Sequence, residues 1–126
     1  MKDIALFVKD FQKGTELSNH LADIDMHVTF AESIYDLPDQ CQIGIIDLDD
    51  EKFGNVEFVS ELNRHTGMML LGYMEKITKD IQDKLKAAGC NMILPSASVV
   101  KNIQSVIQEI TKWEKAKRKK KAEQQW

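Results

Sequence analysis

The sequence lacks most features of exported, membrane-spanning or disulfide-rich proteins. No apolar run approaches the ~20 residues that a membrane-spanning helix needs. The first residues, Met1-Lys2-Asp3, do not begin the long apolar stretch of a signal peptide. The two cysteines, Cys41 and Cys90, lie far apart and form no CxxC motif. We therefore expect reduced thiols and a cytoplasmic location.

The charges of the chain are distributed unevenly. Its 126 residues have a formal net charge of −3, and their composition is typical of one globular domain. By count from the sequence, residues 1–110 carry 10 basic and 18 acidic side chains, whereas residues 111–126 carry 7 basic and 2 acidic ones. We therefore predict an acidic domain over residues 1–112 and a basic helical extension or tail over residues 113–126.

Short apolar runs alternate along the chain with segments of helical spacing. The runs are typical of buried strands and comprise Ile4–Val8, Met26–Phe30, Ile43–Ile46, Met68–Leu71 and Met92–Leu94. Apolar residues at helical spacing lie at 17–24, 56–62, 77–88 and 103–113, and residues 32–40 predict a short helix that Pro38 ends or prevents. This order predicts an α/β fold, a doubly wound (βα)5 arrangement of the flavodoxin-like type. Its five-stranded parallel sheet should have the strand order 2-1-3-4-5.

Acidic residues follow two of the predicted central strands. In an open α/β sheet, ligands bind beyond the carboxyl ends of the strands, where the strand order reverses. Asp10 follows the first strand, and Asp47 ends the third, two residues before Asp49. We predict that Asp10 and Asp47 face each other there and, with a loop carbonyl, suit Mg²⁺. The alternative is that each acid caps a helix or faces solvent.

Two motifs in this arrangement resemble the receiver domain of bacterial response regulators, the CheY-like fold. Ile45-Ile46-Asp47-Leu48 resembles the strand that carries the phosphoacceptor aspartate, and Gly89–Leu94 resembles the glycine-led entry into the fifth strand. The resemblance covers about residues 2–112. It implies that Asp47 is the phosphoacceptor and that Asp10, Asp47 and the carbonyl of Asp49 hold Mg²⁺. It also implies a role in two-component signalling, or phosphorelay, and not that of an enzyme.

Three positions depart from the pattern of that family. Lys9 replaces the first of two acids, Gly72 replaces the Thr or Ser that ends the fourth strand, and Ser96 replaces the Lys that ends the fifth. Because phosphoryl transfer needs positive charge around the phosphoryl oxygens, we expect the switch to be weakened or lost. For Lys9 two alternatives remain: its ammonium reaches Asp47 or Asp10 and neutralises the pocket, or it points to solvent.

The sequence therefore favours an atypical receiver domain, a pseudo-receiver that acts mainly as a protein-interaction module. Its expected partner is a histidine kinase, a phosphotransfer protein or an output protein, and a homodimer stays open. The first alternative is a functional phosphoacceptor that uses Asp47 with Mg²⁺. The second, a flavodoxin-like cofactor binder, is disfavoured because Lys9–Thr15 lacks a hydroxyl-rich phosphate loop.

The basic run Lys117–Lys121 allows several interpretations. It suits a solvated helix end, since the helix dipole favours cations there. It also suits a phosphate-rich polymer, an anionic membrane surface or an acidic partner. No aromatic residue interrupts the run, so we expect no sequence-specific binding of nucleic acid.

Overall fold

The computed structural model describes residues 2–38 and 40–124, with side chains at residues 3–38 and 40–112. In chain order the elements are β1 (Lys2–Phe7), α1 (Phe11–Ala22), β2 (Met26–Phe30), the 3-10 turn η1 (Ile34–Asp36), β3 (Ile43–Asp47), α2 (Val56–Thr66), β4 (Met69–Met74), α3 (Lys79–Ala88), β5 (Cys90–Pro95) and α4 (Val99–Gln124). The strands form one parallel sheet in the order β2-β1-β3-β4-β5. This confirms the predicted fold class and strand order.

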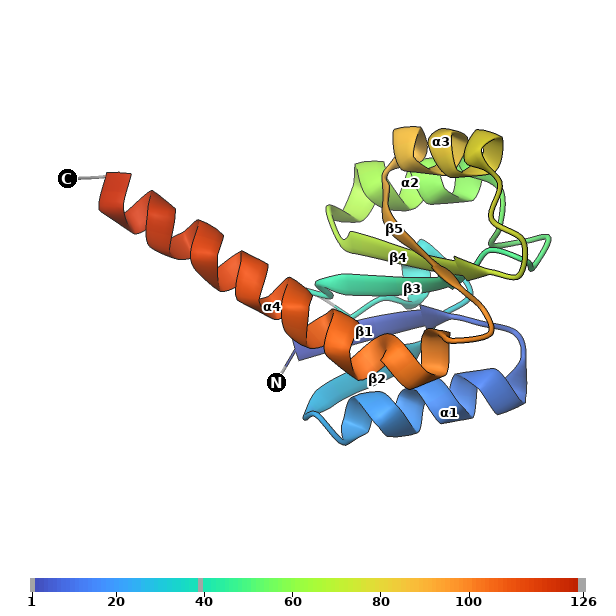
Figure 1. Cartoon of the computed structure of the whole chain (residues 1–126), viewed down its shortest axis with the longest axis horizontal. Helices are drawn as coiled ribbons and strands as arrows, with labels where there is room; N and C mark the ends of the chain where they lie inside the picture. The colour runs from blue at the N-terminus through green and yellow to red at the C-terminus, as the bar shows by residue number, and fades with distance from the viewer. Residues whose placement is uncertain (1, 39, 125–126) are drawn as a thin grey trace.

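Helices cover both faces of the sheet, with α1 and α4 on one face and α2 and α3 on the other (Figure 1). Successive residues of a strand point to opposite faces. Ile4 and Leu6 of β1 therefore pack in the core beneath α1 and α4, whereas Ala5 and Phe7 pack in the core beneath α2 and α3. This double burial explains why the strands are continuous apolar runs rather than alternating ones.

Side-chain caps start the helices at the carboxyl edge of the sheet. Asp10 caps α1, Asn55 caps α2 and Thr78 caps α3, and each side-chain oxygen accepts a hydrogen bond from a backbone N–H in the first turn. At the opposite edge α3 ends at Gly89, whose φ of 119° is left-handed. The caps therefore point the starts of these three helices toward one edge of the sheet.

Two predicted elements differ from the structure. The segment 32–40 holds only the single turn η1, because Ser33 and Asp36 form a capping box around three residues and Leu37 already has an extended backbone before Pro38. The predicted short helix is therefore present as a single 3-10 turn that ends before Pro38, and four α-helices flank the sheet, one fewer than a (βα)5 arrangement implies. Strand β4 continues past Leu71 to Met74, so the predicted strand end near Gly72 is also wrong.

The last helix, α4, extends beyond the body of the domain. Its first half packs on the sheet through Ile103, Ile107 and Ile110, which are fully buried. The helix continues to Gln124 and projects away from the sheet (Figure 1). The division at residues 112 and 113 stays a prediction, and residues 125–126 lie outside the described part. No helix within the described ranges has the length and apolar character to cross a membrane.

Candidate functional site

The carboxyl edge of the sheet brings Asp47, Tyr73 and Ser96 into one region. Asp47 ends β3 and is paired in register with Tyr73 of β4. Ser96 follows β5, and its backbone N–H donates to the carbonyl oxygen of Met74 at 2.9 Å. The backbone N–H of Leu48 donates to the carbonyl oxygen of Tyr73, also at 2.9 Å. The ends of the three strands are therefore hydrogen-bonded to one another.

Asp47 lies in an environment that disfavours its charged form. Partial burial raises the pKa of its carboxyl group, and the nearby carboxylates of Asp49 and Asp50 raise it further. The backbone N–H of Asp49, which donates to Oδ1 of Asp47 at 3.1 Å, and the ammonium of Lys13 act in the opposite direction. Such a half-buried carboxylate, with its pKa raised by desolvation and like charges, is typical of functional sites.

The other acids of this edge already have hydrogen-bond partners. Oδ1 of Asp10 accepts from the backbone N–H of Lys13 at 3.1 Å. Oδ2 of Asp49 accepts from the backbone N–H of Glu75 at 2.8 Å. Oδ1 of Asp50 accepts from the backbone N–H of Lys52 at 2.8 Å. Asp10 therefore caps α1, its binding of Mg²⁺ stays a prediction, and Asp49 ties the loop after β3 to the loop after β4.

Lys9 does not have the partner that the sequence suggested. Its Nζ lies 3.8 Å from Oδ2 of Asp50, and its side chain is 60% exposed. Among the described residues it forms no ion pair with Asp47 or Asp10, so the hypothesis that it neutralises the pocket through either acid is wrong. The carboxylate of Asp50 turns toward Lys9 while it also caps the turn at Lys52 and Phe53. A single exposed pair of this kind contributes little to stability.

Lys13 is the site residue that sequence reasoning missed. Its Nζ donates to both the carbonyl oxygen and Oγ of Ser96, each at 2.8 Å, and these bonds are partly buried. The ammonium also lies 5.5 Å from the centre of the Tyr73 ring. A cation from α1 thus lies beside Ser96, the position where the resemblance had implied a lysine. The only sequence signal was a lysine one turn after a helix-capping acid.

Tyr73 lies beneath this edge of the sheet. Its side chain is 1% exposed and packs in the core beneath α1 and α4. Its hydroxyl is buried and has no hydrogen-bond partner among the described residues. Burial raises the pKa of Tyr73, and the carboxylates of Asp47 and Asp10 raise it further, so the phenol stays protonated. The site therefore contains a buried hydroxyl without a partner.

Gly72 lies inside β4 and not at its end. A Cβ atom at this position would lie 2.8 Å from Cγ of Leu48, so the glycine makes room for the side chain that directly follows Asp47. The residue that closes the strand is Met74, which faces the core beneath α2 and α3. Neither residue has a hydroxyl. The prediction that Gly72 is an altered switch position is untested. Because Met74 is the residue that ends β4, it is a second candidate for that position.

The carboxylate oxygens at this edge are of the ligand type that Mg²⁺ prefers. Asp10 and Asp47 each have a carboxylate oxygen beyond the one that accepts a backbone N–H, and hard cations prefer such ligands. However, no group of three or more His, Cys, Asp or Glu side chains within the described residues lies close enough to hold a metal ion. The predicted site at Asp10, Asp47 and Asp49 therefore stays a prediction, with Asp10 and Asp47 as its side-chain ligands.

The raised pKa of Asp47 predicts that Asp47→Asn stabilises the protein at neutral pH. A carboxyl whose pKa is higher in the folded state favours folding only while it is protonated, and this contribution is lost as the pH rises through the raised pKa. We expect the variant to gain up to about 1 kcal/mol at pH 7, because solvent screens a partly exposed group. Urea denaturation at pH 7 and pH 3.5 measures this. The gain should disappear at pH 3.5, and an equal gain at both pH values would contradict the prediction.

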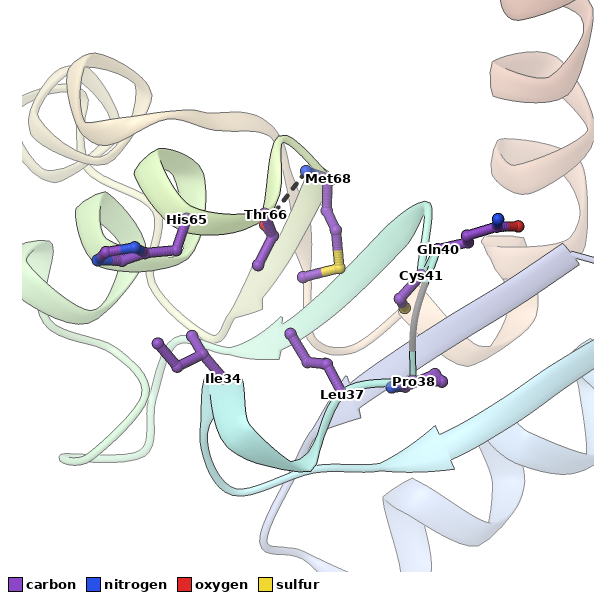
Figure 2. A pocket seen from close by; sticks show the side chains of 8 residues that line it. All are labelled: Ile34, Leu37, Pro38, Gln40, Cys41, His65, Thr66 and Met68. Atoms are coloured by element: carbon purple, nitrogen blue, oxygen red, sulfur yellow. Dashed lines mark hydrogen bonds between the residues drawn. The ribbon is translucent and has the colours of Figure 1, made fainter.

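A pocket lies at the opposite edge of the sheet (Figure 2). It has a volume of about 230 Å³, and its lining includes Ile34, Leu37, Cys41, His65 and Met68. The thiol of Cys41 points to backbone carbonyls, and burial raises its pKa, so it is not an activated nucleophile. This pocket is a small hollow with a mixed polar and apolar lining and does not share a residue with the Asp47 site.

Comparison with known proteins relates this fold to one structural class. No protein-family model matches the chain, and no curated protein matches it. Among solved structures, a CheY-like response regulator receiver domain protein from Methanospirillum hungatei JF-1 is similar with a TM-score of 0.79 at 12% identity, over 93% of this chain and 98% of that one. A two-component response regulator from Clostridium difficile gives a TM-score of 0.79 at 8% identity, over 89% and 97% of the two chains.

A third similar structure is the receiver domain of HemR from Leptospira biflexa. Its TM-score is 0.75 at 14% identity, over 87% of this chain and 94% of that one. The similarity covers nearly the whole of each of these three structures. It is a similarity of backbone fold, since the sequence identities are low. The chain therefore has the CheY-like fold of response regulator receiver domains.

Proposed function

We propose that this chain is an atypical receiver domain of two-component signalling, which acts mainly by binding a partner protein and whose phosphorylation switch is weakened. One observation carries the proposal: β4 ends at Met74, which has no hydroxyl, and the residue that follows β5 is Ser96, which has no ammonium group. These are the positions from which a hydroxyl and a lysine would report a phosphoryl group. Without these two side chains, a phosphoryl group on Asp47 would have a weakened hold on both strand ends.

The surface beside the site supports a protein-binding role. Phe11, the first residue of α1, is 87% exposed and lies next to Asp10 on the rim of the carboxyl edge. An exposed aromatic residue in such a place has no role in the core, and aromatic side chains are enriched at protein interfaces. The partner would be a kinase, a phosphotransfer protein or an output protein.

A functional phosphoacceptor is the second candidate, and Lys13 favours it. In that reaction a carboxylate oxygen of Asp47 bonds to the phosphorus of a phosphodonor, while the bond from phosphorus to the donor breaks and the donor leaves with the electron pair. Magnesium, held by Asp10 and Asp47, would supply positive charge to the phosphoryl oxygens. The ammonium of Lys13 would supply more.

Acetyl phosphate distinguishes the two candidates. We expect the chain with Mg²⁺ and acetyl phosphate to gain at most a small fraction of the +80 Da adduct that an ordinary receiver domain gains under the same conditions, as measured by intact mass spectrometry. Any adduct should be absent from Asp47→Asn. Complete labelling at the rate of the ordinary receiver would refute the weakened switch and establish the second candidate.

A further inference from the structure

We propose that Lys13 is the oxyanion-binding cation of the Asp47 site and replaces, from α1, the lysine that β5 lacks. The inference rests on the second candidate function, because the oxyanion would be a phosphoryl group carried by Asp47. Lys13 and Ser96 are 83 residues apart in the sequence, and only the fold brings them together.

The geometry of Lys13 leaves it able to bind a ligand. An ammonium group has three N–H donors, and Ser96 accepts two of them through its carbonyl oxygen and its hydroxyl, each at 2.8 Å. These bonds hold the ammonium near the end of β5, and its third N–H has no acceptor among the described residues. The aromatic ring beneath this ammonium belongs to Tyr73, which is the register partner of Asp47.

Tyr73, whose ring centre lies 5.5 Å from the ammonium of Lys13, carries a buried polar group at this site. Its hydroxyl is buried in a side chain that is 1% exposed, and it has no hydrogen-bond partner in the described part of the chain. A buried hydroxyl without a partner destabilises a protein. Because Asp47 is the neighbour of Tyr73 in the sheet register, an oxyanion on Asp47 would bring acceptor oxygens to that side of the sheet.

The surrounding carboxylates do not prevent this binding. Asp10 accepts the backbone N–H of Lys13, Asp49 accepts that of Glu75, and Asp50 accepts that of Lys52 and pairs with Lys9. Each of these charges is therefore partly compensated by a donor outside the site. The ammonium of Lys13 lies 2.8 Å from Oγ of Ser96 and 5.5 Å from the centre of the Tyr73 ring.

Beryllofluoride tests the proposal without any transfer chemistry, because it mimics a phosphoryl group on a carboxylate. Calorimetry of the full chain with beryllium chloride, sodium fluoride and Mg²⁺ would compare the wild type with Lys13→Met and Lys13→Gln. We expect binding to the wild type, none to Asp47→Asn, and at least tenfold weaker binding to both Lys13 variants. Lys101→Met, which removes an exposed lysine of α4, is the matched control and should bind like the wild type.

A rescue variant separates the binding role from a structural one. Lys13→Met combined with Ser96→Lys returns an ammonium to the site from β5, and we expect it to regain most of the lost affinity. A Lys13 variant that binds as tightly as the wild type would overturn the inference and leave the phosphoacceptor function intact. A wild type that binds no beryllofluoride would overturn it as well, and the interaction-module proposal would then stand without it. Circular dichroism would confirm that each variant is folded.

Discussion

Replacing Gly54 by alanine should destabilise the fold by about 2–4 kcal/mol, because the added methyl group would overlap backbone atoms. A Cβ atom at Gly54 would collide with the carbonyl oxygen of Leu48 and lie 2.8 Å from that of Asp50. No rotamer change relieves a contact with backbone, so the loop from residue 48 to residue 54 would have to open. The free energy of unfolding, measured by urea denaturation, should fall by this amount.

Gly67→Ala is the matched control for this prediction. Gly67 has a left-handed φ of 64°, and a Cβ atom there would meet nothing within 4 Å. Alanine at that position bears only the conformational cost of about 1 kcal/mol. If Gly54→Ala costs no more than Gly67→Ala, the close approach between Gly54 and Leu48 does not hold the loop.

The requirement for glycine at position 54 connects stability with the site. The N–H of Gly54 donates to the carbonyl oxygen of Asp50 at 2.7 Å, which closes the loop that starts directly after Asp47. The carboxylates of Asp49 and Asp50 belong to the same loop, and Asp49 ties it to the N–H of Glu75. A variant that opens the loop should therefore also change the pKa of Asp47, whose cause is partly the nearness of Asp49 and Asp50.

The fold could be predicted from the sequence because its signals are local and repeated. Each strand is an apolar run and each α-helix has an apolar stripe, and right-handed crossovers leave few ways to connect them. The errors lie where local signals conflict. Residues 32–40 contain helix-compatible residues, but Ser33 and Asp36 cap a single turn. Gly72 was predicted to lie at the end of the fourth strand. It lies inside β4, where the lack of a side chain leaves room for Leu48.

The chemistry of the site was predictable only where it followed from the ends of strands. Asp10 and Asp47 could be placed at one edge because parallel strands end together. The partner of Lys9 depended on which way the Asp50 side chain turned, and that is decided by the turn at Lys52 and Phe53. The role of Lys13 could not be predicted from the sequence, because its partner Ser96 is 83 residues away. The sequence of α1 also contains no motif that marks Lys13 as a functional residue.

Phe53→Ala should be the most damaging of the side-chain truncations near the site, with a loss of about 3–5 kcal/mol in the free energy of unfolding. Phe53 is 1% exposed and belongs to a cluster of three rings, with centroids 5.9 Å from Phe7 and 5.3 Å from Phe58. These rings join β1 and α2 to the loop that follows Asp47. Truncation would leave a cavity and remove two ring contacts, so urea denaturation should show the loss directly.

Tyr35→Ala tests whether this loss comes from burial, because Tyr35 is an aromatic residue of similar size that is 90% exposed. We expect it to change the free energy of unfolding by less than about 0.5 kcal/mol. Phe53→Leu keeps most of the buried volume and should cost less than Phe53→Ala while it remains folded. Phe53→Leu removes only the ring contacts of this cluster. If the cluster anchors the loop, amide hydrogen exchange at residues 48–54 should accelerate more than exchange in β1. Equal acceleration in both segments would mean that Phe53 stabilises the core as a whole, and that the loop is held by the hydrogen bond between Gly54 and Asp50.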